Sequence, residues 1–315
     1  MKAWNGFRKG VNLGGWLSQC DYSKERLENF ITESDFRQLA SWGLDHVRLP
    51  MDYNVLETDN GYSAYGFSLV EKAIAWAKKY RLNIVLDLHK TAGFMFDEAA
   101  QENGFFSDPA LQERFYRLWE QLAERFGRDP DHVAFELLNE VTDPAFGPVW
   151  NRIAKECIRR IRAIAPDTVI LVGGYHNNSP AAVVDLDPPY DDRVVYNIHC
   201  YDPVQFTHQH AYWVSFLDVQ HDMSFADCGA DAAYFRQLFA EAAAKAKENG
   251  TVLYCGEYGV IDHATPEDTL AWYQTIHQVF EEYGISRCAW SYKEMDFGLT
   301  DARLDGVRDE LIKCL

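Results

Sequence analysis

The stretch VAFELLNE (133–140) sets the pattern from which the fold is inferred. It is a short, nearly continuous apolar run that ends on the polar pair Asn139-Glu140. Such a run is typical of a parallel strand that is covered on both faces. The run 133–139 has seven counterparts along the chain: 9–14, 44–50, 82–89, 168–174, 194–200, 252–258 and 287–292. We therefore expect eight strands.

Amphipathic stretches separate these runs, and several have recognisable helix starts. Each start combines a capping residue with an acidic residue three positions on, or with proline at the first helical position. The four starts are Thr32 with Asp35, Ser68 with Glu71, Asp108 before Pro109, and Thr265 before Pro266. Eight strands alternating with helices predict an α/β protein with a right-handed (β/α)8 TIM barrel, in a single domain spanning 1–315.

One long irregular segment, 201–230, follows the sixth predicted strand. A connection of this length is usually functional or disordered. Its aromatic residues favour an ordered insertion that walls the cleft at one face of the barrel. Together with the loops 15–30, 91–107 and 141–150, it supplies four candidates for outer ligand contacts: Trp16, Phe94, Phe206 and Trp213.

The net charge of −18 limits the choice of partner. An acidic surface repels nucleic-acid backbones and anionic lipid, so we expect neither nucleic acid nor membrane as a partner. The seven cysteines are scattered and have no metal-type spacing, which predicts free thiols, no metal and no cofactor. The oligomeric state cannot be predicted from these features.

Free thiols also favour a reducing compartment. No apolar leader precedes the first predicted strand, and no run has transmembrane length, so a cytoplasmic location is expected. A secreted chain whose signal peptide had been removed would read the same.

Polar or aromatic residues stand at the carboxyl ends of six predicted strands: Arg48, His89, Asn139-Glu140, His199 with Tyr201, Glu257, and Trp290. Each alone has a structural explanation, such as a rim ion pair or a core histidine. Six together at one face are harder to explain by packing, and function in such barrels lies at that face. Two glutamates at the carboxyl ends of two strands of one barrel, Glu140 and Glu257, are the equipment for cleaving a glycosidic bond.

This set of residues resembles glycoside hydrolase family 5, within clan A of the retaining β-glycosidases. The resemblance rests on HVRLP, LDLHK, LLNE, NIHCY, CGEYG and AWSYK, which span most of the chain. The segments NLGGW, DHVRLPMDY, FTHQHAYW and YKEMDF are similar to those of compact bacterial endo-β-1,4-glucanases in that family.

The resemblance implies a role for each residue. Glu257 is the nucleophile, and Glu140 is the general acid and then the general base. Asn139 binds the 2-hydroxyl of the reacting sugar, and Arg48 and Tyr201 hydrogen-bond to the nucleophile. His199 lies near the acid, His89 binds the sugar in the cleavage subsite, and Trp290 forms the platform beneath it. A retaining mechanism requires the two carboxyl groups to lie about 5–5.5 Å apart.

The expected activity is hydrolysis of β-1,4-linked glucans, on cello-oligosaccharides and mixed-linkage β-glucan. An exo-acting β-glucosidase or exo-β-1,3-glucanase of the same family is the alternative. A metal-dependent barrel hydrolase would need clustered histidines, and a non-catalytic sugar-binding barrel would lack one carboxylate. A phosphate-binding barrel would not place a carboxylate in its glycine-rich loop.

Lys90 departs from the family pattern, in which an uncharged residue is common at this position. It either binds a sugar hydroxyl or points to the rim and pairs with Asp97 or Glu98, and the rim position is slightly favoured.

Overall fold

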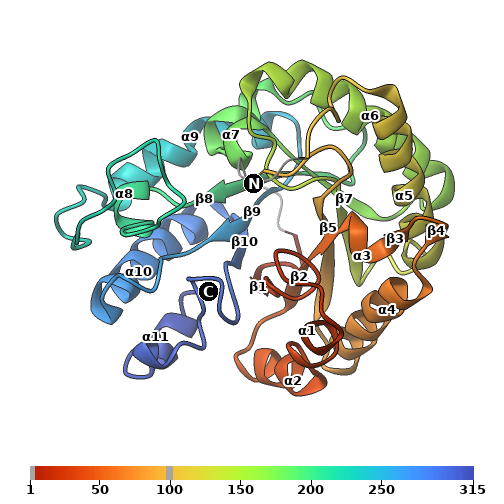
Figure 1. Cartoon of the computed structure of the whole chain (residues 1–315). Coiled ribbons are helices and arrows are strands. Elements are labelled where there is room, and N and C mark those ends of the chain that lie inside the picture. Colours follow the sequence, from red (N-terminus) through yellow and green to blue (C-terminus); the bar gives the residue numbers. More distant parts are fainter. Residues whose placement is uncertain (1–3, 97–101) are drawn as a thin grey trace.

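Eight parallel strands form a closed barrel in the computed structural model, which describes residues 4–96 and 102–315 (Figure 1). In barrel order the strands are β1 (Lys9–Asn12), β2 (His46–Asp52), β5 (Asn83–Lys90), β6 (Val133–Glu136), β7 (Val169–Gly173), β8 (Val194–Cys200), β9 (Leu253–Tyr258) and β10 (Ser286–Ala289). Pairing of β1 with β10 closes the barrel. The predicted TIM barrel is confirmed, and each predicted run overlaps one of its strands.

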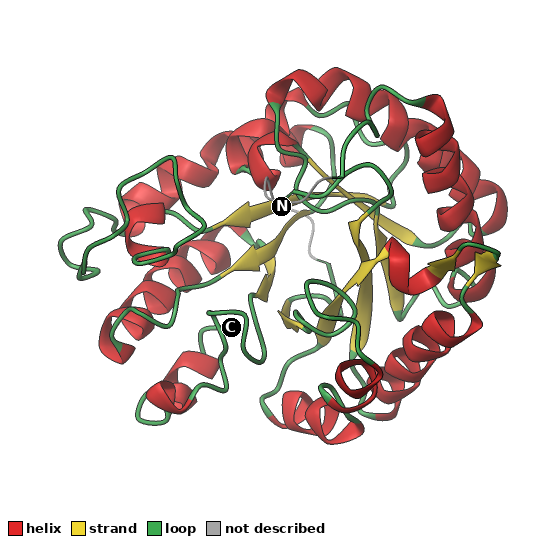
Figure 2. Ribbon diagram, viewed as in Figure 1, coloured by secondary structure: helices red, strands yellow, loops and turns green. Residues whose placement is uncertain are grey.

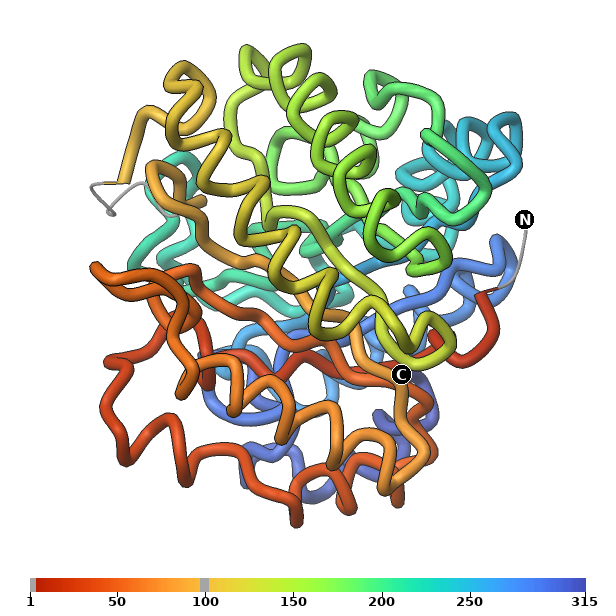
Figure 3. Tube along the Cα trace, turned by 90° about the vertical axis from the view of Figure 1, so that its right-hand side faces the viewer, coloured from red at the N-terminus to blue at the C-terminus, as the bar shows by residue number. Residues whose placement is uncertain are grey.

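Helices surround the strands, as Figure 2 shows in red around yellow. The α-helices of five or more residues are α1 (Lys24–Asn29), α2 (Glu33–Ser41), α4 (Ala64–Lys79), α5 (Pro109–Phe126), α6 (Gly147–Ile164), α9 (Ala232–Glu248), α10 (Pro266–Tyr283) and α11 (Arg308–Ile312). Shorter elements lie in the connections: α3 (Tyr53–Leu56), α7 (Tyr175–Asn178), α8 (Val204–Thr207), the 3-10 turns η1 (Pro144–Phe146), η2 (Pro180–Asp185) and η3 (Ala302–Leu304), and the hairpin β3 (Glu57–Thr58) with β4 (Gly61–Tyr62). Helices α5 and α6 pack side by side on the outside of the barrel (Figure 3).

Three of the four predicted helix starts are confirmed. Thr32 forms the capping box of α2, and Asp108 and Thr265 cap α5 and α10 ahead of their prolines. The start at Ser68 is wrong, because α4 begins one turn earlier. Its cap is Ser63, whose side chain accepts the Gly66 N–H at 2.9 Å, whereas Ser68 donates to the Tyr65 carbonyl inside the helix.

The amino end of the barrel is filled by the start of the chain. Trp4 and Phe7 stack with ring centroids 4.2 Å apart, and Trp4 meets Tyr254 edge to face. They pack on inward-facing residues of several strands, including Val85 and Leu171. This end is therefore closed by apolar packing, and the polar residues collect at the other end.

The segment 201–230 contains α8 and is otherwise irregular, and it extends outward at the left of Figure 1. Its inner side is anchored, since Ala211, Val214 and Val219 pack into an apolar cluster with Trp290. Its outer side presents Tyr212 and Phe216 to solvent, with 87% and 74% exposed. The expected order of this segment is thus visible in its buried inner side.

All seven cysteines are free thiols, as predicted, and five of them are buried. Within the residues that the structure describes, no helix combines the length and apolarity needed to cross a bilayer. The cytoplasmic location stays a prediction.

Candidate active site

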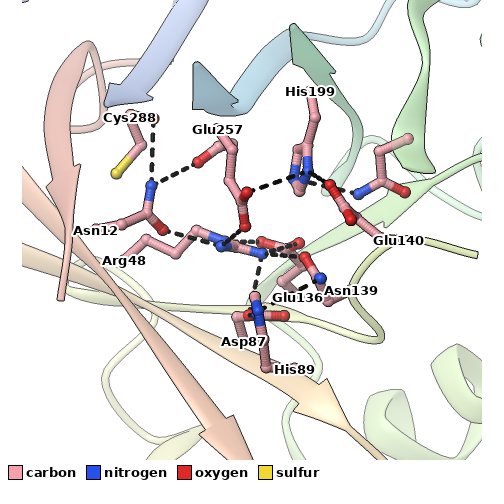
Figure 4. Close-up of polar contacts among 12 residues, drawn as sticks. Asn12, Arg48, Asp87, His89, Glu136, Asn139, Glu140, His199, Glu257 and Cys288 are labelled. Atoms are coloured by element: carbon pink, nitrogen blue, oxygen red, sulfur yellow. Dashed lines mark hydrogen bonds and ion pairs between the residues drawn. The ribbon is translucent and has the colours of Figure 1, made fainter. Parts of the chain in front are cut away.

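The carboxyl ends of the strands bring together the residues that the family resemblance singled out. Figure 4 shows Arg48, His89, Asn139, Glu140, His199 and Glu257 among them. Arg48, His89, His199 and Glu257 lie on β2, β5, β8 and β9. The others stand just beyond a strand: Asn139 and Glu140 after β6, Tyr201 after β8, and Trp290 after β10. All but Tyr201, which is half-buried, are buried.

Glu257 accepts hydrogen bonds on both carboxylate oxygens. The Arg48 Nη1 donates to Oε1 at 2.7 Å, and the Tyr201 hydroxyl donates to Oε2 at 2.8 Å. His199 Nδ1 lies 3.6 Å from Oε2. A cation and a hydroxyl donor thus each form a short, charge-assisted hydrogen bond to this carboxylate.

Glu140 has a different environment, without a direct cation. His199 Nδ1 is 2.7 Å from its Oε1, and the Asn177 amide donates to its Oε2 at 2.9 Å. Burial raises the pKa of Glu140 above the usual glutamate range, and the Asn177 hydrogen bond opposes part of that rise. Burial also lowers the pKa of His199 to about 4, so this imidazole is neutral at pH 7.

The backbone of Glu140 is in the left-handed region, with φ of 44°. A residue with a Cβ adopts this conformation only when its surroundings enforce it, and such residues concentrate at functional sites. The carboxyl group is thereby turned toward His199 and Glu257. One atom from each of Glu140, His199 and Glu257 lies within 4.8 Å of the other two.

Arg48 is held in a buried network that sequence reasoning missed. Its Nε and Nη2 donate to both oxygens of Glu136 at 2.7 and 2.8 Å, and Nη2 lies 3.0 Å from Asp87. Nη1 also donates to Asn12 at 2.9 Å. Burial alone would lower the pKa of Arg48, but the carboxylates of Asp87, Glu136 and Glu257 raise it well above its ordinary value. The signal was present: Glu136 and Asp87 are acidic residues inside otherwise apolar strands, where an unpaired charge is very costly.

His89 and Trp290 form a flat stack on one side of the site. Their rings are nearly parallel, at 5° with centroids 5.7 Å apart. His89 Nδ1 lies 2.6 Å from Asp87. Burial favours the neutral imidazole, but the Asp87 carboxylate outweighs it and raises the pKa of His89.

The four aromatic residues expected to make outer contacts differ in how deeply they are buried. Trp16 is buried with its indole N–H donated to the Leu27 carbonyl, and its ring stacks on Trp76. Phe206 is fully buried against Phe225, and Phe94 is buried beside Phe106. These three rings fill the core, so the expectation that they face the cleft is wrong.

Trp213 alone of the four is open to solvent, at 42%. Its ring meets His208 edge to face at 6.3 Å, and His208 meets Tyr201 at 5.1 Å. Trp213 therefore stands two rings away from the hydroxyl that contacts Glu257.

Lys90 forms an ion pair of 3.2 Å with Glu102 and lies 5.6 Å above the ring of Tyr53. Asp97 and Glu98, its expected partners, lie outside the described residues. The lysine is paired with a rim carboxylate, as the favoured interpretation required, but the described partner is another residue.

Among residues 4–96 and 102–315, the cluster with spacing suited to a metal ion is Glu140, His199 and Glu257. Their ligand atoms are already engaged with one another, with Arg48 and with Tyr201. The expected absence of a metal stays a prediction.

Comparison with known proteins places this geometry in a family. The model of the cellulase family, glycosyl hydrolase family 5, matches residues 5–296. The chain belongs to glycoside hydrolase family 5. It is therefore a glycoside hydrolase of the cellulase type, a class that cleaves β-glucans.

Relatives in the family extend over nearly the whole chain. Cellodextrinase A of Ruminococcus flavefaciens is 53% identical over 283 residues, which cover 90% of this chain and 84% of the relative. Endoglucanase C of Acetivibrio thermocellus is 36% identical, with 98% of each chain covered.

Solved structures agree in fold. An endoglucanase superposes with a TM-score of 0.84 over 98% of this chain and 97% of that chain, at 21% identity. A hyperthermophilic endo-β-1,4-glucanase in complex with substrate gives a TM-score of 0.81 over 94% of this chain and 92% of that chain, at 23% identity.

Proposed function

We propose that this family 5 glycosidase hydrolyses β-1,4-linked glucans with retention of configuration, by double displacement at Glu257 and Glu140. The observation that carries the proposal is the approach of the two carboxyl groups, which have one oxygen each within 4.8 Å. Retaining glycosidases hold their carboxyl groups about 5–5.5 Å apart, whereas inverting enzymes leave about 6.5–9.5 Å for a water molecule. The spacing here favours direct attack by a carboxylate.

In the first step, Glu257 attacks the anomeric carbon while Glu140 protonates the departing glycosidic oxygen. The contacts divide these roles between the glutamates. Arg48 and Tyr201 contact both oxygens of Glu257, as suits a nucleophile, whereas burial without a direct cation raises the pKa of Glu140, as suits an acid. A covalent glycosyl-enzyme and a free leaving chain result.

In the second step, water attacks the anomeric carbon, its proton passes to Glu140, and the bond from that carbon to Glu257 breaks, which frees the carboxylate and releases the sugar. The ester at Glu257 no longer carries the negative charge of the free carboxylate. Loss of that neighbouring charge favours the ionised form of Glu140, so the same residue now acts as a base. His199 is neutral and lies between the two carboxyl groups, so it can orient Glu140 without fixing its charge.

The substrate class rests on the relatives and on the aromatic stack. The names of two relatives, a cellodextrinase and an endoglucanase, point to β-1,4-glucans of short and long chain length. Trp290, stacked with His89 at the site, offers a flat apolar surface suited to a pyranose ring. Cello-oligosaccharides and mixed-linkage β-glucan are therefore the proposed substrates. Exo-action on short chains is the alternative that the cellodextrinase name favours.

The test is hydrolysis of carboxymethyl-cellulose, mixed-linkage β-glucan, laminarin, mannan and short cello-oligosaccharides. Variants Glu140→Gln and Glu257→Gln are compared with Glu241→Gln, which alters an exposed glutamate of α9. We expect both site variants to lose activity and the control to keep it. The first product should be the β-anomer by proton NMR. Activity that survives in Glu257→Gln, or an α-anomer as first product, refutes the proposal.

A further inference from the structure

A groove runs along the outside of the barrel between α6 and the segment 175–190. It consists of two adjoining hollows of about 660 and 490 Å³. Both are bordered by Asn151, Lys155 and Asp187, so they form one continuous depression. Hollows of this size accommodate small-molecule or oligomeric ligands.

The groove exists because one connection of the barrel lacks a full helix. Between β7 and β8 the chain forms α7 and η2, of four and six residues, where five other connections have helices of 16 to 18 residues. One side of α6 is therefore not covered by a neighbouring helix. We call the hollow of about 660 Å³ the upper hollow and the hollow of about 490 Å³ the lower hollow. The apolar residues Leu186, Val194 and Tyr196 form the floor of the lower hollow.

The upper end of the groove lies on the same two connections of the barrel as Glu140 and its partner Asn177. Pro144 and Tyr175 border the upper hollow, and both lie on connections that leave the carboxyl ends of strands. Asn177, two residues after Tyr175, is the residue that donates to Glu140. Since the acid stands at the leaving-group oxygen, the groove begins on the side where the leaving part of the substrate emerges.

The groove then follows α6 from Pro148 to Ile158. Ten residues of helix span about 15 Å at 1.5 Å per residue. The depression is therefore long enough for several sugar units in a row.

The side chains along the groove suit a neutral, hydroxyl-rich chain. Tyr190 is 46% exposed and offers a ring face beside Pro188 and Pro189. Lys155 and Asp187 are exposed on opposite sides of the groove. Among the described residues, neither their ammonium nor their carboxylate group has a protein partner. Lys155 supplies hydrogen-bond donors and Asp187 supplies acceptors for the hydroxyl groups of a sugar, and together they add no net charge to the groove. An anionic ligand would be repelled by Asp187 and by the overall charge of −18.

We propose that this groove binds the leaving-group side of a long β-glucan chain, as an extension of the cleft on the outside of the barrel. The proposal rests on the proposed function and deepens it, because it assigns this enzyme a preference for polymer over short oligosaccharides. Tyr190 provides the ring contact, and Lys155 with Asp187 provides the polar contacts.

The experiment compares polymer and short substrates in the full chain. Tyr190→Ala and the double variant Lys155→Ala with Asp187→Ala are measured beside Tyr65→Ala. Tyr65 is the matched control because it is a similarly exposed tyrosine, at 44%, on α4. Binding to mixed-linkage β-glucan is measured by affinity electrophoresis with Glu257→Gln as the background, and kcat/KM on cellotriose is measured in the active enzyme.

We expect the groove variants to weaken polymer binding about five- to tenfold and to leave kcat/KM on cellotriose unchanged, since losing one exposed aromatic contact is worth about 1 kcal/mol. Tyr65→Ala should match the parent on both substrates. Unchanged polymer binding in both groove variants overturns the groove proposal, and so does an equal loss on cellotriose. If the parent hydrolyses no β-1,4-glucan of any length, the proposed function itself fails.

Discussion

Asn177 controls the protonation of the proposed acid through one hydrogen bond, and removing it should extend activity toward higher pH. Its amide donates to Glu140 Oε2 at 2.9 Å and stabilises the ionised carboxylate. The backbone of Asn177 is left-handed, with φ of 55°, so glycine replaces it without strain. Asn177→Gly therefore deletes the donor and preserves the turn.

The direction in which the alkaline limb of the pH profile moves follows from the role of Glu140 in the first step. The acid works only while it is protonated, so kcat/KM falls as the pH rises through the pKa of Glu140. Burial already raises that pKa, and the Asn177 hydrogen bond opposes the rise. Loss of the bond raises the pKa of Glu140 further, and the alkaline limb of the profile moves to higher pH.

The size of the movement follows from the exposure of Asn177. A hydrogen bond to a charged group contributes about 1.5–3 kcal/mol. Because Asn177 is exposed, a water molecule can donate to Glu140 in its place and recover part of that energy. A net change of about 1 kcal/mol moves the limb by about 0.7 of a pH unit.

The assay is kcat/KM against pH on a chromogenic cello-oligosaccharide. His176→Gly is the control, because His176 also has a left-handed backbone, with φ of 49°, and its side chain is exposed. The control should keep the parental limb. An Asn177→Gly profile whose alkaline limb stays in place, or moves to lower pH, contradicts the assignment of Glu140 as the acid.

Four further substitutions test the network and the aromatic assignments. Glu136→Gln should lower the free energy of unfolding by about 3–5 kcal/mol in a denaturant titration, because the new amide NH2 must face an N–H donor of Arg48 or of Asn197. A loss under about 1 kcal/mol would argue against a buried ion pair. Tyr201→Phe should lower kcat about 10- to 100-fold with little change in Tm, and an unchanged kcat would show that the hydroxyl does not assist the nucleophile. Trp16→Ala should cost about 3–5 kcal/mol of stability while KM stays at the parental value, and a raised KM with parental stability would restore it as a sugar contact. Trp213→Ala should raise KM on oligosaccharides several-fold without lowering Tm, and a lower Tm with constant KM would make it a packing residue.

The fold was predictable because its signals are local. Each strand is an apolar run bounded by polar residues, and three helix starts carry a cap that acts within one turn. The failure at Ser68 is also local: Ser63 and Ser68 both precede a suitable sequence, and the choice depends on where the preceding α3 and hairpin leave the chain.

Placement of the polar residues at the strand ends was predictable for a geometric reason, because the carboxyl ends of parallel strands meet at one face of the barrel. The burial of an aromatic side chain was not predictable from its residue type. Trp16 and Trp213 look alike in sequence, yet one is buried against Trp76 and the other is exposed. Asn177 gave no signal, since its contact with Glu140 depends on the left-handed turn of α7.

Closure of the barrel links the two ends of the chain in a way that bears on biosynthesis. Strand β1 pairs with β10, so Gly10 lies beside Cys288. Asn12, which positions Arg48, donates to the carbonyl groups of Gly256, Cys288 and Ala289. These contacts join the first strand of the barrel to the last strand in sequence order. The nascent chain must therefore keep its early strands from aggregating until the final strand emerges, and a barrel assembled in this order is expected to rely on chaperones more than a protein built from local contacts.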